Sequence, residues 1–126
     1  MGRKVYNANG IPAVGPYSHA VEAGELVYLS GQTPKGSSSE EIMIGDIGAQ
    51  TKQCFVNLFE VLKAANLTPD DVIKVNVYLT DMNNFAAMNE VYQTQFNKPY
   101  PARTTIGVLA LPLGAEVEIE MIAKRP

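Results

Sequence analysis

Apolar residues recur at helical spacing in two parts of the chain. After Asp46 the apolar positions are Ile47, Cys54, Phe55, Leu58, Val61, Leu62 and Ala65. After Asp81, Asn83 and Asn84 they are Phe85, Met88, Val91, Tyr92 and Phe96. Residues three and four positions apart share one face of a helix, so each part predicts a helix with one apolar face. We expect the first helix to begin at Asp46 and end at Asn66, and Pro99 to stop the second.

Elsewhere the apolar period is two, which is typical of a strand with one buried face. One such alternation comprises Ile73, Val75, Val77 and Leu79, and another comprises Val117, Ile119 and Met121. Two further strands, 18–22 and 25–30, are separated by Ala23-Gly24, which indicates a hairpin. A fifth strand is expected at 103–109. The polar segment 34–45 predicts a flexible surface loop.

The resulting order is strand, strand, helix, strand, helix, strand, strand. Two helices can cover only one face of a sheet, so we predict an α+β fold: a two-layer sandwich with a mixed sheet of five to six strands. The other sheet face includes Tyr28 or Leu29 and Thr105 or Ile106, whichever way those strands turn. We expect a partner to bury part of that face. A chain of 126 residues predicts a single domain over 1–126.

Composition and charge exclude several classes of site. Ten Lys and Arg stand against thirteen Asp and Glu, and the net charge of -3 with no basic cluster disfavours a nucleic-acid partner. Cys54 is the single cysteine, so it cannot form an internal disulfide, and with the lone His19 it cannot complete a four-ligand zinc site. No apolar leader and no apolar run of membrane-spanning length is present. We therefore expect a cytoplasmic protein.

Arg103 and Glu118 are the first candidates for chemistry. Pro99 and Pro101 stiffen the approach to Arg103, and a guanidinium held at a strand start can bind a carboxylate through two parallel hydrogen bonds. The alternative is a salt bridge at the surface or between subunits. Glu118 lies between Glu116 and Glu120, and strand alternation puts the three on one face. They form a solvated acidic face, or Glu118 positions a water as general base.

Three further features give weaker signals. His19, in the early hairpin, is expected to be a surface or subunit-contact residue rather than a catalyst. Gly15-Pro16-Tyr17-Ser18 is a proline-led turn that leads into a strand. Ser30-Gly31-Gln32 ends the next strand, where a glycine allows backbone or ligand to approach closely. The sequence contains no phosphate-binding glycine loop and no nucleophile elbow.

In combination and in this order, these motifs resemble the RidA family, also called the YjgF or L-PSP family. The resemblance is carried by residues 15–18, 30–32, 101–103 and 117–120 and extends over nearly the whole chain. It implies a chorismate-mutase-like fold and a homotrimer with clefts between subunits. It also implies hydrolysis of 2-enamine and 2-imino acids, such as 2-iminopropanoate and 2-iminobutanoate, to 2-oxo acids and ammonia. Such an activity would protect pyridoxal-phosphate enzymes and needs no metal or cofactor.

The resemblance also implies roles for individual residues. Arg103 would bind the substrate carboxylate, and Glu118 would hold or activate the attacking water. The residues that would bind or enclose the substrate are Tyr17, Ser30, Gly31 and Thr105.

This sequence departs from the family pattern at three places. Thr104-Thr105 stands where many relatives have a small residue followed by cysteine, and Leu109-Ala110-Leu111-Pro112 where they have Ala-Arg-Leu-Pro. His19 stands where glutamine is common. These differences bear on substrate preference rather than on the arginine–glutamate chemistry.

Two other functions remain open. The cleft could bind a 2-oxo acid without turnover, as a small-molecule binding or regulatory module. Some members of the family have also been called endoribonucleases. RNA cleavage usually needs imidazole groups and a cationic groove, and one histidine with a net charge of -3 provides neither.

Overall fold

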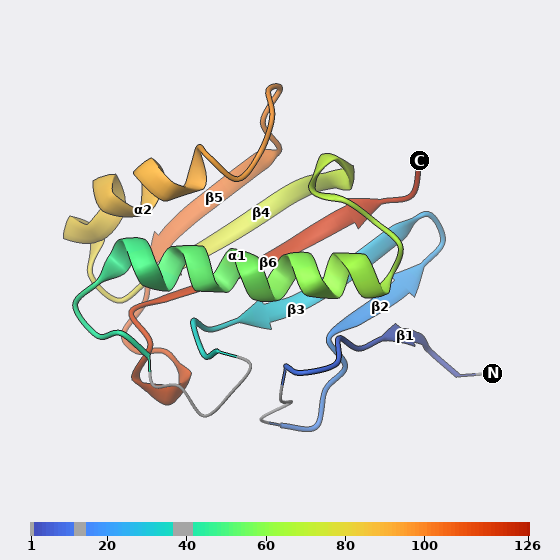
Figure 1. The fold of residues 1–126 in the computed structure, drawn as a ribbon, viewed down its shortest axis with the longest axis horizontal. Helices are drawn as coiled ribbons and strands as arrows, with labels where there is room; N and C mark the ends of the chain where they lie inside the picture. Colours follow the sequence, from blue (N-terminus) through green and yellow to red (C-terminus); the bar gives the residue numbers. More distant parts are fainter. Residues whose placement is uncertain (1, 12–14, 37–41) are drawn as a thin grey trace.

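In the part of the chain that the computed structural model describes, residues 2–11, 15–36 and 42–126, two helices cover one face of a six-stranded sheet (Figure 1). In chain order the elements are β1 (Lys4–Tyr6), β2 (Ala20–Ala23), β3 (Leu26–Gln32), α1 (Ile47–Ala64), β4 (Val72–Leu79), α2 (Phe85–Tyr92), β5 (Ala102–Gly107) and β6 (Val117–Lys124). Short 3-10 helices lie at Pro69–Asp71, Met82–Asn84 and Pro112–Gly114. The predicted two-layer α+β architecture is confirmed.

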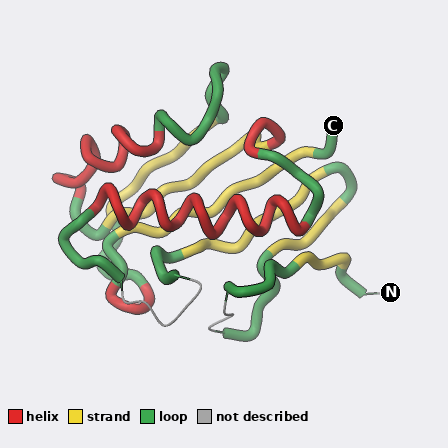
Figure 2. The backbone as a smooth tube through the Cα atoms, in the orientation of Figure 1, coloured by secondary structure: helices red, strands yellow, loops and turns green. Residues whose placement is uncertain are grey.

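The strands lie in the order β1-β2-β3-β6-β4-β5, so β1 and β5 form the two edges (Figure 1). Figure 2 shows the helices crossing over the strands of this sheet. β4 and β5 run parallel and the other neighbours run antiparallel, which makes the sheet mixed as predicted. β2 and β3 form the predicted hairpin. The sequence pattern does not predict β1, because its three residues are too few to show an alternation.

Helix α1 supplies one layer of the core. The Asp46 side chain accepts a hydrogen bond from the Ala49 N–H at 2.9 Å, which confirms the predicted N-cap. Beyond the helix end, Asn66 has a positive φ of 59°, a conformation that asparagine tolerates and that turns the chain away. The Phe55 ring packs edge-on against the rings of Tyr92 and Phe96, each at 5.6 Å, and so joins α1 to α2.

Two details of the predicted elements are wrong. Helix α2 ends at Tyr92 rather than close to Pro99, although Phe96 still reaches the core from beyond the helix. Ile73 is 43% exposed, because a shift in register between Val72 and Lys74 puts Val72 into the core in its place. The predicted surface loop at 34–45 includes residues 37–41, which lie outside the described residues.

Two polar side chains also lie elsewhere than predicted. His19 is buried, not on the surface, because the N-terminal segment covers it: its Nδ1 accepts a hydrogen bond from the Ala8 N–H at 3.0 Å. Burial lowers the pKa of this imidazole. Glu116 does not share a face with Glu118, because it precedes β6 and its carboxylate accepts a hydrogen bond from Gln50 of α1 at 2.7 Å.

The sheet face away from the helices carries both apolar and acidic groups. Of the alternatives that the strand pattern left open for this face, Tyr28 and Ile106 are the residues that lie on it, each 46% exposed. Leu29 points into the core instead. Glu118 and Glu120 are half-buried on the same face. Along β6, Val117, Ile119 and Met121 therefore face the core and the two carboxylates face away from the helices, as the alternation predicted.

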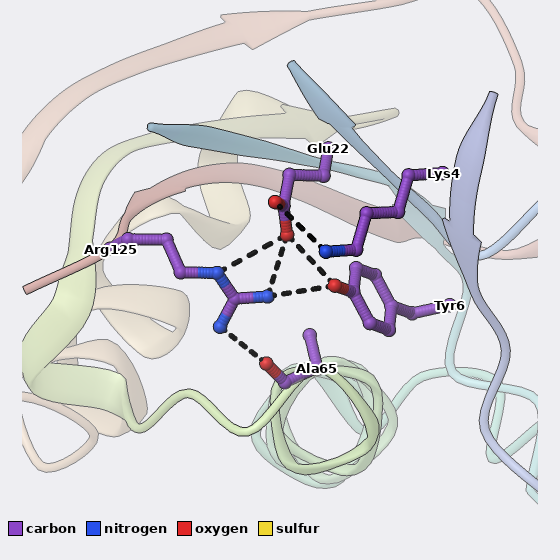
Figure 3. A network of polar contacts seen from close by, with 5 residues as sticks. All are labelled: Lys4, Tyr6, Glu22, Ala65 and Arg125. Atoms are coloured by element: carbon purple, nitrogen blue, oxygen red, sulfur yellow. Dashed lines mark hydrogen bonds and ion pairs between the residues drawn. The ribbon is translucent and has the colours of Figure 1, made fainter. Parts of the chain in front are cut away.

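A polar network ties the chain ends to the sheet and to α1 (Figure 3). The Arg125 guanidinium donates to Glu22 Oε1 at 2.7 Å and to the Tyr6 hydroxyl at 3.0 Å. It also donates to the carbonyl of Ala65, just beyond the end of α1, at 2.6 Å. Tyr6 donates to Glu22 at 2.8 Å, and Lys4 forms an ion pair with Glu22 at 3.5 Å. The network therefore holds the short edge strand β1 in place.

No helix in the described part of the chain combines the length and the apolar character needed to cross a bilayer.

Candidate functional site

A cavity of about 590 Å³ opens where β3 ends beside β6. Four of the six predicted site residues line it together: Tyr17, Ser30, Gly31 and Glu118. Tyr17 comes from the proline-led turn, Ser30 and Gly31 from the end of β3, and Glu118 from β6. The turn meets the end of β3 because β2 and β3 form a hairpin, and β6 pairs with β3. These four residues therefore lie around one cavity of a single chain.

Glu118 lies directly against the backbone of Gly31. A β-carbon on residue 31 would stand 2.5 Å from Glu118 Oε2 and 3.1 Å from its Cδ, so glycine at this position lets the carboxylate lie where it does. The ladder between β3 and β6 shifts register between Leu29 and Gln32, which is where this approach occurs. The glycine thus serves close packing rather than an unusual backbone conformation.

The surroundings of Glu118 favour its protonated form. Burial raises the pKa of its carboxyl group above the ordinary value of 4.5, and the nearby charge of Glu120 raises it further. Glu120 itself accepts hydrogen bonds from Asn76 Nδ2 and from the Tyr78 hydroxyl, each at 2.9 Å. A carboxylate with a raised pKa is a stronger base, and a base in a cavity can take a proton from a water molecule.

Tyr17 and Ser30 form part of the cavity wall. The Tyr17 ring folds back over Gly15, where an added β-carbon would meet the ring at 3.2 Å, and the side chain stays 43% exposed. The Ser30 hydroxyl donates to the carbonyl of Ser18 at 2.7 Å. That bond joins the turn to β3, so the Ser30 hydroxyl holds the wall together.

Arg103 and Thr105 lie on the opposite face of the sheet. In the parallel ladder Arg103 pairs with Val75 and Thr105 with Val77, and both valines are fully buried beneath the helices. Glu118 pairs with Tyr78 on the other face. A single chain therefore does not bring Arg103 to Glu118, although both belong to the predicted set.

Arg103 is held by helix α2. Its Nη1 donates to Asn89 Oδ1 at 2.6 Å, and its guanidinium carbon lies 4.6 Å from the centre of the Tyr92 ring and 5.5 Å from that of Phe85. Across residues 2–11, 15–36 and 42–126, no acidic side chain forms an ion pair with Arg103. The guanidinium is thus oriented by neutral groups and keeps its charge for an anion.

Sequence reasoning missed several residues around these two groups. Asn89 and Tyr92 are three positions apart, and this helical spacing was the available signal for a shared face towards Arg103. Ile11, Lys35 and Leu113 line the cavity from three separate segments, and no sequence pattern connects them. Within the described ranges, no cluster of three or more His, Cys, Asp or Glu side chains could hold a metal ion.

A family model and several known proteins match nearly the whole chain. The family model described as endoribonuclease L-PSP matches residues 7–125. A RutC family protein of Pyrococcus horikoshii is 44% identical, with 98% of each chain covered. The 2-iminobutanoate/2-iminopropanoate deaminase of Mus musculus is also 44% identical, over 96% of this chain and 90% of that protein. The chain belongs to the RidA (L-PSP) family.

Solved structures agree with this assignment. The RidA of an Antarctic Psychrobacter bacterium superposes with a TM-score of 0.90 at 42% identity, covering 97% of this chain and 99% of the other. TdcF of E. coli, solved with bound serine, superposes with a TM-score of 0.90 at 37% identity, covering 98% and 99%. Several relatives have names that refer to imine deamination, and others have different names.

Proposed function

We propose that this protein hydrolyses reactive 2-imino acids, among them 2-iminopropanoate and 2-iminobutanoate, to 2-oxo acids and ammonia. The observation that carries the proposal is the Glu118 carboxylate, packed on Gly31 inside a cavity with its pKa raised by burial. Relatives named 2-iminobutanoate/2-iminopropanoate deaminase, at 40–44% identity, support the substrate class. TdcF binds serine, which like an imino acid carries a carboxylate beside a nitrogen-bearing carbon.

The site of this proposal is completed by a second copy of the chain. Arg103 and Glu118 lie on opposite sheet faces, so both can act on one substrate only if they come from different subunits. A homotrimer, in which each chain gives Arg103 to one neighbour and receives it from the other, is a closed ring of this kind. The exposed Tyr28 and Ile106 provide apolar area for such contacts.

The proposed mechanism needs one cation and one base. Arg103 binds the imino acid carboxylate through two parallel hydrogen bonds and so fixes the C=N carbon beside Glu118. Glu118 takes a proton from water while the water oxygen bonds to that carbon, and the electron pair of the C=N bond moves to nitrogen. Glu118 returns the proton to nitrogen. The C–N bond then breaks, the remaining hydroxyl proton moves to nitrogen, and ammonia and a 2-oxo acid leave.

A trapping assay tests this proposal. An amino-acid oxidase generates 2-iminopropanoate from alanine in the presence of semicarbazide, and hydrolysis is measured as the fall in trapped imine. We expect the wild type to reduce trapping, and Glu118→Gln and Arg103→Ala to lose about 100-fold or more of that activity. Glu60→Gln changes an exposed carboxylate on α1 and is the matched control. A wild type no better than Arg103→Ala would refute the mechanism.

The same variants separate the enzyme from a binding module. Glu118→Gln keeps the shape of the cavity, so a protein that only binds 2-oxo acids would be unaffected by it. Retained binding of 2-oxobutanoate with loss of hydrolysis supports the enzyme. Hydrolysis that is unchanged by Glu118→Gln, and equal to that in buffer, supports the module.

A further inference from the structure

The cavity around Glu118 is larger than a short imino acid needs. 2-Iminopropanoate has six non-hydrogen atoms, and an arginine side chain from a neighbouring copy adds seven. At ~30 Å³ each, the volume share of a water molecule, these atoms would fill about 390 Å³. The cavity measures about 590 Å³. In the single chain, the cavity therefore has space beyond these two groups.

That space continues into a second hollow. A neighbouring cavity of about 320 Å³ is lined by Lys35, Ile42, Ile44 and Leu113. Lys35 and Leu113 line both cavities, so the two hollows adjoin at these side chains. Ile44 is 64% exposed and Leu113 is 52% exposed, so an apolar group bound in this hollow would remove apolar surface of both side chains from water.

The charges in the main cavity disfavour a second anionic group on the substrate. Glu118 and Glu120 both line this cavity, and Lys35 is the cation among its described lining residues. One substrate carboxylate is matched by Arg103, but a second would meet two carboxylates and one ammonium. A distal apolar group avoids this repulsion and can cover Leu113 and the aliphatic stem of Lys35.

We propose that the second hollow holds the side chain of the substrate, so that this protein prefers 2-imino acids with long apolar side chains, such as the imine of leucine. The inference rests on the proposed function and specifies its substrate class. The reactive carbon lies at Glu118, and the side chain extends past Leu113 towards Ile44. Enzymes that oxidise branched or long-chain amino acids are the class of reaction that would supply these imines.

The experiment compares kcat/KM for three imines that amino-acid oxidases generate in situ from leucine, alanine and aspartate. Each is followed by semicarbazide trapping. We expect kcat/KM for the leucine-derived imine to exceed that for the alanine-derived imine about tenfold or more, since each added methylene can contribute that much. The aspartate-derived imine is expected to be the poorest substrate. Ile44→Ala and Leu113→Gly should lower the leucine-to-alanine ratio about fivefold.

The variants are chosen to fold. Ile44 is mostly exposed, and Leu113 has a positive φ of 62°, which glycine adopts without strain. Val56→Ala, which trims an exposed apolar side chain on the outer face of α1, is the matched control and should leave the ratio unchanged. A leucine-to-alanine ratio of kcat/KM at or below one in the wild type would overturn this inference but leave the proposed function standing. The same holds if Ile44→Ala and Leu113→Gly leave that ratio unchanged. A wild type that hydrolyses none of the imines refutes the proposed function as well.

Discussion

Gly31 and Glu118 are packed so closely that a side chain at position 31 would displace the Glu118 carboxylate. A β-carbon at residue 31 would lie 2.5 Å from Oε2 of Glu118, on a face of the sheet where that carboxylate lines the cavity. The backbone of β3 therefore determines where the proposed base stands. A substitution at one of these two positions should therefore alter the geometry of the other residue.

Gly31→Ala should reduce hydrolysis without unfolding the protein. The new methyl group displaces a side-chain end rather than backbone, and a displacement of about 1 Å at a reacting group can cost on the order of 100-fold in rate. Gly48→Ala is the matched control, because its β-carbon would meet neighbours at an ordinary 3.7 Å within α1. Rates by the trapping assay and melting temperatures would be compared for both. Full activity in Gly31→Ala would contradict the role given to Glu118.

The pH dependence of hydrolysis should follow Glu118. Burial raises the pKa of this carboxyl group above 4.5, so the base becomes protonated, and kcat/KM falls, at a higher pH than for an exposed glutamate. We expect an acid limb with an apparent pKa above 4.5 in the wild type and no such limb in the residual activity of Glu118→Gln. The same limb in both proteins would assign the titration to the substrate instead.

Asn89 should position Arg103. Its Oδ1 accepts from the guanidinium at 2.6 Å, and loss of a hydrogen bond to a charged group is worth about 1.5–3 kcal/mol. Asn89→Ala should raise KM about tenfold with a smaller change in kcat, because the substrate carboxylate meets a less ordered guanidinium.

A second substitution at the same position distinguishes positioning from packing. Asn89→Asp keeps the shape but pairs with Arg103 and competes with the substrate, so its KM should rise further. Asn97→Ala, which removes an exposed amide, is the control. A lower KM in Asn89→Asp than in Asn89→Ala would exclude this role.

Acid should weaken the Glu22–Arg125 network. Hydrogen bonds from Arg125 and then Tyr6 lower the pKa of Glu22 from 4.5 to about 2. A carboxyl group whose pKa is lowered by folding stabilises the protein above its unfolded pKa, and this contribution disappears as the pH falls from about 4.5 to 2. Urea unfolding at pH 6, 4 and 2 should show Glu22→Gln less stable than the wild type at pH 6, with the difference shrinking towards pH 2.

Glu25→Gln provides the comparison for that measurement. Glu25 is 77% exposed and lies 3.8 Å from Lys124, so its ion pair contributes little. Glu118, whose pKa is raised, has the opposite dependence on pH, but it is present in all the proteins compared and cancels from the differences. An equal pH dependence in Glu22→Gln and the wild type would rule out the stabilising role of the network.

Association and activity should be lost together. Ile106 is 46% exposed on the open sheet face, so Ile106→Glu puts a charge into the proposed contact between copies. We expect the wild type to have three times the 13.7 kDa mass of the chain in light scattering, and the variant to be monomeric and inactive. Val56→Glu on the outer face of α1 should remain trimeric. An active monomer would refute a site shared between chains.

The sequence by itself determined the two helices, five of the six strands and the family. Helical spacing located α1, and the period of two located β4 and β6, because these patterns depend only on local geometry. The predictions for three residues were wrong. Ile73 is exposed because the register of β4 and β6 shifts, and His19 is buried because the N-terminal segment covers it. Glu116 lies off the acidic face because it precedes β6 and contacts α1. Local periodicity contains no information about such non-local contacts.

Only the tertiary structure decided which candidate residues share a site. Alternation assigns relative faces within one strand, whereas the faces of Arg103 and Glu118 depend on how β5 and β6 each pair with β4. The observed pairing puts Arg103 and Glu118 on opposite faces of the sheet within one chain. The same folding brings Lys35, Leu113 and Glu118 to the lining of one cavity from distant parts of the sequence. Their proximity follows from long-range strand pairing and packing, which no spacing along the chain records.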